Sequence, residues 1–129
     1  MDYQDFTVIS RAEGGEFHCR FRTLTRGIAP RHSDTADIQF MVGGKAVTVA
    51  LPMTAFTDFR ERHGRVITDL ESIQVAGRIL KDFIEREILP EDRCLTPSHE
   101  QALHIAEILT GAKSENSRLG PRMVQKAAR

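Results

Sequence analysis

Apolar and polar residues alternate near the start of the chain, which is the pattern of β-strands with one buried face. Within residues 16–25 the two alternating sets are Phe17, Cys19 and Phe21 on one side and His18, Arg20 and Arg22 on the other. Residues 5–11 are rich in types that favour strands, and residues 12–15 contain two glycines suited to a turn. We therefore predict an antiparallel hairpin over residues 5–25 with one buried face.

A second hairpin is predicted over residues 37–51, because two short alternating stretches flank the pair Gly43-Gly44. Two glycines in a row have the chemistry of a two-residue hairpin turn. The apolar positions of the two stretches are Ile38, Phe40, Val42, Val47 and Val49. Residues 26–36, between the two hairpins, have turn chemistry without periodicity, so we expect a long loop there.

The strongest helical pattern covers residues 68–89. Thr68 and Glu71 have the spacing of a capping box, and Pro90 is expected to end the helix. Gly77 lies in the helix interior, where glycine costs about 1 kcal/mol relative to alanine. Either another backbone segment approaches closely at this point, or the glycine has no structural role. The apolar stripe, at i, i+3, i+4 spacing, comprises Leu70, Ile73, Ala76, Leu80, Phe83 and Ile84.

Two shorter helices complete the predicted elements. Residues 52–63 have a helical pattern, with Gly64 placed as a C-cap. After a loop at residues 91–95, Thr96-Pro97 fits the N-cap and first position of a helix that ends at Gly111. Strands in one run followed by helices in another indicate an α+β fold. We predict an N-terminal antiparallel four-stranded meander sheet packed on one face by three helices.

The length of 129 residues fits one domain, which we assign to residues 1–111. Residues 112–129 hold five basic residues against one acidic residue, a net charge of +4, while the whole chain has a formal net charge of zero. We expect a flexible basic tail there. Two cysteines, no signal sequence and no long apolar run predict a cytoplasmic protein with reduced thiols that does not bind membranes.

No motif predicts a catalytic residue, a metal site or a cofactor. His99 and His104 are five residues apart, so they do not share the helix face that two zinc ligands require. His32 and Asp34 offer two ligands, which are too few for a site. The G-x-S-x-G, P-loop and dinucleotide-binding motifs are absent. We therefore predict no catalytic, metal-binding or cofactor-binding residues, and no small-molecule ligand is indicated.

Basic residues are enriched between positions 11 and 32. Guanidinium groups suit phosphate because their donors match its oxygens in pairs. The candidate nucleic-acid-binding residues are His18, Arg20, Arg22, Arg26, Arg31 and His32. His18 supplies the only ring on this strand face, although base stacking usually requires exposed rings. The alternative is a solvated sheet face whose charges pair with acidic residues on neighbouring strands.

By elimination, we predict a small non-catalytic module, of bacterial or phage type, that binds another macromolecule. The leading interpretation is a protein partner or a second copy of the chain. The first alternative is nucleic-acid binding through the arginine-bearing sheet face, the loop at 26–36 and the basic tail. The second is an enzyme whose catalytic residues are scattered along the sequence.

Overall fold

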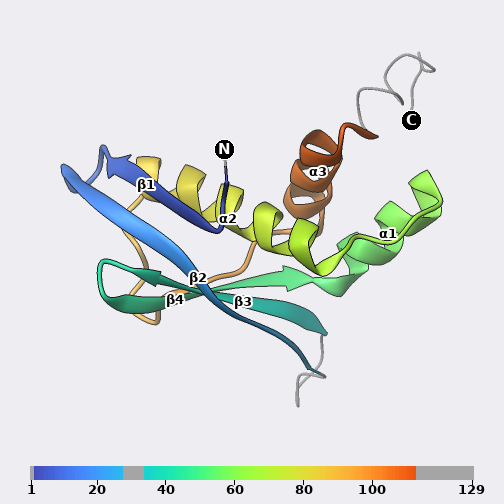
Figure 1. Ribbon diagram of the computed structural model, residues 1–129, viewed down its shortest axis with the longest axis horizontal. Coiled ribbons are helices and arrows are strands. Elements are labelled where there is room, and N and C mark those ends of the chain that lie inside the picture. The colour runs from blue at the N-terminus through green and yellow to red at the C-terminus, as the bar shows by residue number, and fades with distance from the viewer. Residues whose placement is uncertain (1, 28–33, 113–129) are drawn as a thin grey trace.

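The computed structural model describes residues 2–27 and 34–112, with only the backbone described at 26–27. It contains a five-stranded sheet and three helices (Figure 1). In chain order the elements are β1 (Asp5–Ser10), β2 (Gly15–Gly27), β3 (Thr35–Val42), β4 (Lys45–Pro52), α1 (Met53–His63), α2 (Asp69–Arg86), β5 (Cys94–Leu95) and α3 (His99–Thr110). Within these residues no helix is long and apolar enough to cross a membrane.

The sheet has the strand order β1-β2-β3-β4-β5. The first four strands form an antiparallel meander, and β5 pairs with β4 in parallel. α2 runs along one face of the sheet, with α3 beside it (Figure 1). No helix covers the other face within the described residues. The predicted α+β architecture is therefore confirmed, with one short strand added at the β4 edge.

Alternation along the strands separates a core face from an outer face. Each of the apolar positions predicted for the second hairpin is buried, and Cys19 is 0% exposed. Gly43 and Gly44 both have positive φ, 58° and 86°, as a two-residue turn matching the twist of its strands requires. Phe17 and Phe21 are partly buried against the same core. Burial of this continuous apolar face is the main favourable contribution to folding.

The connection between the hairpins is shorter than the loop predicted for residues 26–36. β2 continues to Gly27 and β3 starts at Thr35, with Gly27 and Thr35 opposite each other in the register. The register shifts between Phe21 and Thr23, so Arg22 is the extra residue of a β-bulge. Ala36 in this extension is 0% exposed, but a single buried alanine gives no periodic signal within residues 26–36.

α2 begins with the predicted capping box. The Thr68 hydroxyl accepts from the Glu71 amide at 3.1 Å, and a Glu71 carboxylate oxygen accepts from the Thr68 amide at 3.0 Å. The helix ends at Arg86, three residues before the predicted end. Leu70 was predicted in the buried stripe, but its side chain is 54% exposed. The core-facing positions at this end of α2 are Ser72 and Ile73, which are buried, and Leu70 lies on another side of the helix.

Gly77 is where the N-terminal segment crosses α2. A Cβ atom at this position would lie 2.4 Å from the Tyr3 carbonyl oxygen and 2.5 Å from its Cβ. The Tyr3 amide donates to Gln74 Oε1 at 2.9 Å, and Gln74 Nε2 donates to Asp2 at 3.1 Å. The first of the two interpretations of Gly77 is therefore confirmed, and the approaching backbone is that of Tyr3.

Two details of the C-terminal part differ from the predictions. The N-cap of α3 is Ser98, whose hydroxyl accepts from the Gln101 amide at 3.1 Å, rather than Thr96. Residues 91–95 were predicted as a loop, but Cys94 and Leu95 pair with β4. The pairing explains why the N-cap lies at Ser98 rather than Thr96, because it holds residues 94–95 extended and α3 begins only after them. Gly64 and Gly111 are the C-caps that follow α1 and α3, as predicted.

Candidate functional site: a groove beside α2 and an open sheet face

A groove of about 480 Å³ lies between the C-terminal half of α2, the segment containing β5 and the first turn of α3. Its bottom is apolar, because Ile79 and Leu95 are buried and Phe83 is partly buried against the core. Its mouth is polar, because Arg86, Glu87 and Gln101 are exposed. The remaining lining residues are Asp82, Pro90, Cys94, Thr96 and Pro97.

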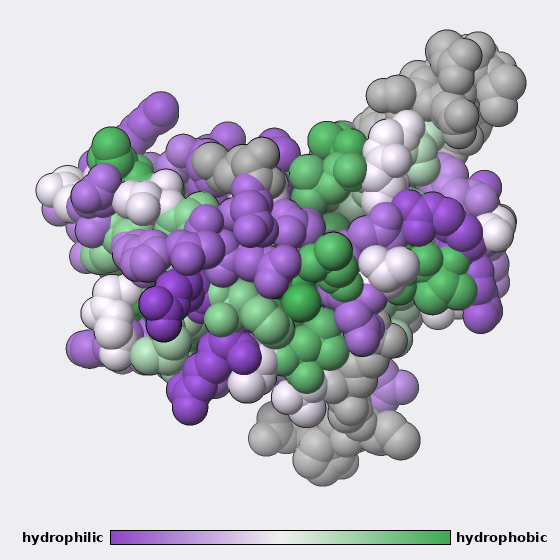
Figure 2. Space-filling view, viewed as in Figure 1, coloured by the Kyte–Doolittle hydropathy of each residue, from purple (hydrophilic) through white to green (hydrophobic). Residues whose placement is uncertain are grey.

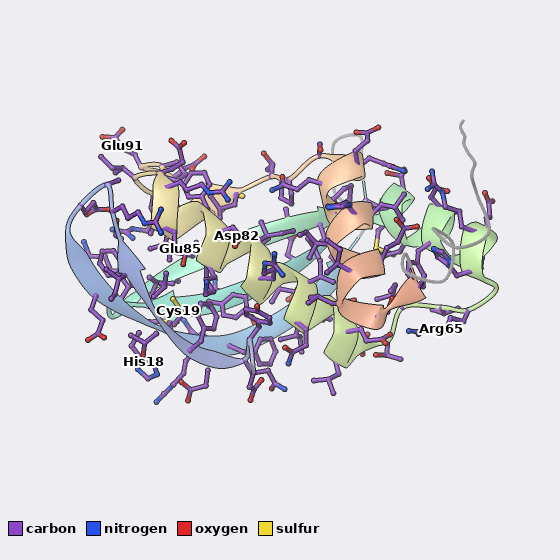
Figure 3. All side chains as sticks on the ribbon, turned by 90° about the horizontal axis from the view of Figure 1, so that it is seen from above. His18, Cys19, Arg65, Asp82, Glu85 and Glu91 are labelled. Carbon is purple, nitrogen blue, oxygen red and sulfur yellow. The ribbon has the colours of Figure 1, made fainter. Side chains whose placement is uncertain are left out.

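Most charges along this side of α2 are matched within the helix. Arg78 Nε donates to Asp82 at 3.1 Å, and Lys81 Nζ donates to Glu85 at 2.9 Å. The bond from Lys81 holds the pKa of Glu85 below its usual range, and the charge of Arg86 contributes. Figure 3 shows Asp82 and Glu85 along α2, with Glu91 beyond its end. Glu87 lines the groove without an ion-pair partner in the described part of the chain.

Cys94 is the only nucleophilic thiol in the groove lining. Burial raises the pKa of this thiol, and the charges of Asp92 and Asp37 raise it further. The thiolate, rather than the thiol, is the nucleophile and the metal ligand, so this environment disfavours both roles. No group of three or more potential metal ligands occurs within residues 2–27 and 34–112.

The arginine-bearing sheet face predicted from the sequence is only partly described. His18, Arg20 and Arg22 are exposed on β2, and they share the outer face, away from the helices. Arg31 and His32 lie outside the described residues, as does the side chain of Arg26. The structure therefore brings three of the six candidate residues onto one surface.

Acidic and apolar neighbours surround these three residues. His18 Nε2 lies 2.5 Å from Asp5 Oδ1, and Asp5 is also directly opposite Arg20 in the register. Arg22 Nη1 lies 3.7 Å from the sulfur of Met41. Cross-strand contacts of this kind are what the solvated-face interpretation predicts.

Two histidines join α1 to α3, and no local sequence pattern indicated either link. His99 Nδ1 lies 2.9 Å from the Thr54 hydroxyl, and His99 Nε2 lies 3.0 Å from Asp58 Oδ2. The order hydroxyl, imidazole, carboxylate matches that of a hydrolase triad. However, Arg62 Nε also binds Asp58, at 3.0 Å, and neither Thr54 nor Asp58 lines the groove. We assign the three side chains to holding the helices together.

The second link joins the end of α1 to the middle of α3. His63 Nε2 lies 2.7 Å from Glu107 Oε2, and both side chains are less than a tenth exposed. Arg62 Nη1 lies 3.8 Å from the same oxygen. The ring of His63 also packs on Phe59, with 4.6 Å between ring centroids. These partners are 44 residues apart in the sequence, so only the tertiary structure shows the pair.

Several large apolar side chains outside the groove also reach the surface. On the face seen in Figure 1, Figure 2 shows one broader apolar area near the centre and smaller ones elsewhere, with hydrophilic side chains between them. Isolated exposed apolar residues are normal on soluble proteins and do not define an interface. The large exposed apolar residues are Ile9, Val66, Leu70, Ile88 and Ile108.

No protein-family model matches the chain, and comparisons with curated proteins and with solved structures found no match.

Proposed function

We propose that this chain is a non-catalytic module that binds a segment of a partner protein in the groove beside α2. The observation that carries the proposal is the composition of the groove. The bottom of the groove is apolar and is formed around Ile79, Phe83 and Leu95, and charged side chains flank its opening to solvent. Partner-binding surfaces combine an apolar centre with a polar rim in this way. A cytoplasmic location is also our proposal, supported by the two free thiols.

A cavity of this volume would also accommodate a small organic ligand. Such sites usually hold several polar groups that converge on the ligand. Here Asp82 is already bound to Arg78, and the thiol of Cys94 is held in its neutral form. A peptide segment needs fewer convergent groups than a small molecule, because its backbone and several side chains share the contacts. We therefore favour a peptide occupant.

The test compares proteins captured by the wild-type chain and by two variants. Gln101→Trp places a large side chain in the mouth of the groove from an exposed position, so the fold should be unaffected. Glu61→Trp makes the same change at an exposed position of α1 that does not line the groove. We expect quantitative mass spectrometry to show partners retained by wild type and Glu61→Trp and lost by Gln101→Trp. Equal capture by all three would contradict the proposal.

Nucleic-acid binding is a second candidate, favoured by the position of His18, Arg20 and Arg22 on a sheet face without helices. Binding through phosphates would weaken steeply with salt. Under our proposal, the full chain should not bind single- or double-stranded nucleic acid at low salt. Salt-dependent binding that Arg20→Glu with Arg22→Glu abolishes, while Arg60→Glu on α1 does not, would favour the nucleic-acid alternative instead.

A further inference from the structure

The groove runs beside the free edge of the sheet. β5 is the last strand, and within the described residues nothing pairs with its other side. The Thr48 amide donates to the Arg93 carbonyl at 2.9 Å, whereas the Arg93 amide donates to the Pro90 carbonyl. Thr48 is the register partner of Cys94, and in a parallel pair the residue between the bonded groups directs its own amide and carbonyl to the other side. The amide of Cys94 is bound by Asp92 Oδ1 at 3.1 Å, which leaves its carbonyl for an added strand.

An extended segment at this edge would also meet the apolar bottom of the groove. Side chains of a strand point alternately to its two faces. One set would contact Leu95 and Phe83, and the other would point to the mouth and solvent. Strand addition to an exposed sheet edge, with pockets for alternate side chains, is an established mode of peptide recognition.

The unmatched charges around the groove are mainly negative. Glu87 lines it, Glu91 follows the lining residue Pro90, and Glu100 precedes the lining residue Gln101. All three glutamates are exposed, and none has an ion-pair partner among the described residues. The basic residues counted in the same way are Arg86, which lies close enough to Glu85 to affect its pKa, and Arg93, which precedes the lining residue Cys94. Charge complementarity therefore favours a positively charged occupant.

We propose that the groove binds an extended, basic segment of a partner protein, which adds to the edge of β5. Alternate apolar side chains of the segment enter the groove, and its lysines or arginines lie near Glu87, Glu91 and Glu100. This inference rests on the proposed function and specifies the chemistry of the partner.

The experiment uses the full chain and a short synthetic peptide in which lysine alternates with valine. Two readouts are combined: fluorescence anisotropy of the labelled peptide at low salt, and the alkylation rate of Cys94, which lines the groove. Cys19 is 0% exposed and does not interfere. Binding should slow alkylation of Cys94 by roughly tenfold. A matched peptide of glutamate and valine should neither bind nor protect.

Two controls separate charge from backbone pairing. Glu87→Lys with Glu100→Lys should weaken binding by about tenfold or more, equivalent to about 1.4 kcal/mol. Glu16→Lys with Glu61→Lys, at exposed positions that do not line the groove, should bind like wild type. A lysine–valine peptide that is N-methylated at alternate residues keeps its charge but loses N–H donors, and it should not bind.

The inference is overturned if the lysine–valine peptide does not bind, binds without protecting Cys94, or is weakened equally by both pairs of substitutions. It is also overturned if the chain covers its own groove. If Cys94 is protected from alkylation without added peptide and Arg122→Glu with Lys126→Glu removes this protection, the occupant is the C-terminal segment. If the protection of Cys94 rises with protein concentration, the occupant is a second copy of the chain. If Gln101→Trp loses partner capture but the lysine–valine peptide does not bind, the proposed function is supported and the basic extended segment is rejected.

Discussion

At the scale of single residues, Gly77 is the position where the structure leaves no room for a side chain. Alanine normally stabilises a helix interior by about 1 kcal/mol relative to glycine. In Gly77→Ala the new methyl group would overlap the backbone of Tyr3, so we expect a net loss of about 1–3 kcal/mol. Urea-induced unfolding measures the change in the free energy of unfolding.

Gln74→Ala is the matched control for this prediction. It removes the hydrogen bond to the Tyr3 amide without adding an atom near Tyr3, so it should cost about 1 kcal/mol or less. A Gly77→Ala variant that is as stable as wild type, or more stable, would show that Tyr3 does not pack on α2.

Glu71 is the residue whose ionisation should most affect stability in acid. Its carboxylate accepts two hydrogen bonds from Arg65, at 3.0 and 2.8 Å. The bonds from Arg65, and then those from Thr68, lower the pKa of Glu71 from 4.5 to about 2. A pKa lowered by folding means that the carboxylate stabilises the protein above pH 4.5, and that this contribution is lost as the pH falls toward 2.

Glu71→Gln tests this dependence, because glutamine keeps the capping-box acceptor but not the charge. We expect the wild type to lose stability relative to the variant between pH 4.5 and 2. The difference should be on the order of 1 kcal/mol, since the pair is partly exposed to solvent. Thermal unfolding across this pH range measures it. Glu61→Gln should show the same pH dependence of stability as the wild type. If Glu71→Gln also shows the wild-type pH dependence, the prediction is contradicted.

At the scale of elements, the sequence predicted what depends on neighbours along the chain. The alternation in β2, β3 and β4, the Gly43-Gly44 turn and the capping box of α2 are local, and each was confirmed. β5 was missed, because two residues carry no periodicity and its pairing with β4 joins Thr48 to Cys94 across 46 positions. The groove was missed for the same reason, since β5 forms one of its walls.

The links between α1 and α3 are also non-local, and they lead to a prediction about how α1 is held. Glu107 is 7% exposed and binds His63. Removal of one partner from a buried hydrogen-bonded pair leaves the other polar group unsatisfied. Glu107→Ala should therefore reduce the free energy of unfolding by about 1–3 kcal/mol. Arg62→Ala removes a side chain that is 52% exposed and should cost less than about 1 kcal/mol.

Urea unfolding at neutral pH gives both values under the same conditions. Comparing Glu107→Ala with Arg62→Ala is informative because Arg62 contacts the same oxygen of Glu107 as His63 does. Equal losses from the two substitutions would show that the buried pair contributes no more than the exposed one.

At the scale of the whole molecule, the helices cover one face of the sheet and leave two candidate interaction surfaces. The outer sheet face carries His18, Arg20 and Arg22 from the N-terminal hairpin. The groove is made by α2, β5 and α3, from the C-terminal half of the described chain. Sequence reasoning located the first surface, since it lies along one strand, and the second required the assembled fold. Charge separates them, as the first is basic and the second has an acidic rim.

The two thiols differ in their exposure to solvent, so they should react with alkylating reagents at very different rates. Cys94 is partly exposed in the groove. Cys19 is 0% exposed in the core, and burial raises its pKa to about 12. Alkylation requires both access and thiolate, so Cys19 should react only when the core opens. Native protein should therefore incorporate one label, and unfolded protein two.

The Cys94→Ser variant turns Cys19 into a probe of global unfolding. At neutral pH its labelling should be at least about 1000-fold slower than that of a cysteine in a short unstructured peptide, which corresponds to a free energy of unfolding of about 4 kcal/mol or more. The rate should rise with urea in parallel with unfolding followed by circular dichroism, because core residues exchange through the globally unfolded state. Rapid labelling of Cys19 in the absence of urea would mean that the sheet separates from α2 without global unfolding. The hairpin β1–β2 would then be the mobile part of the fold, since Cys19 is paired with Phe6 on one side and Val42 on the other.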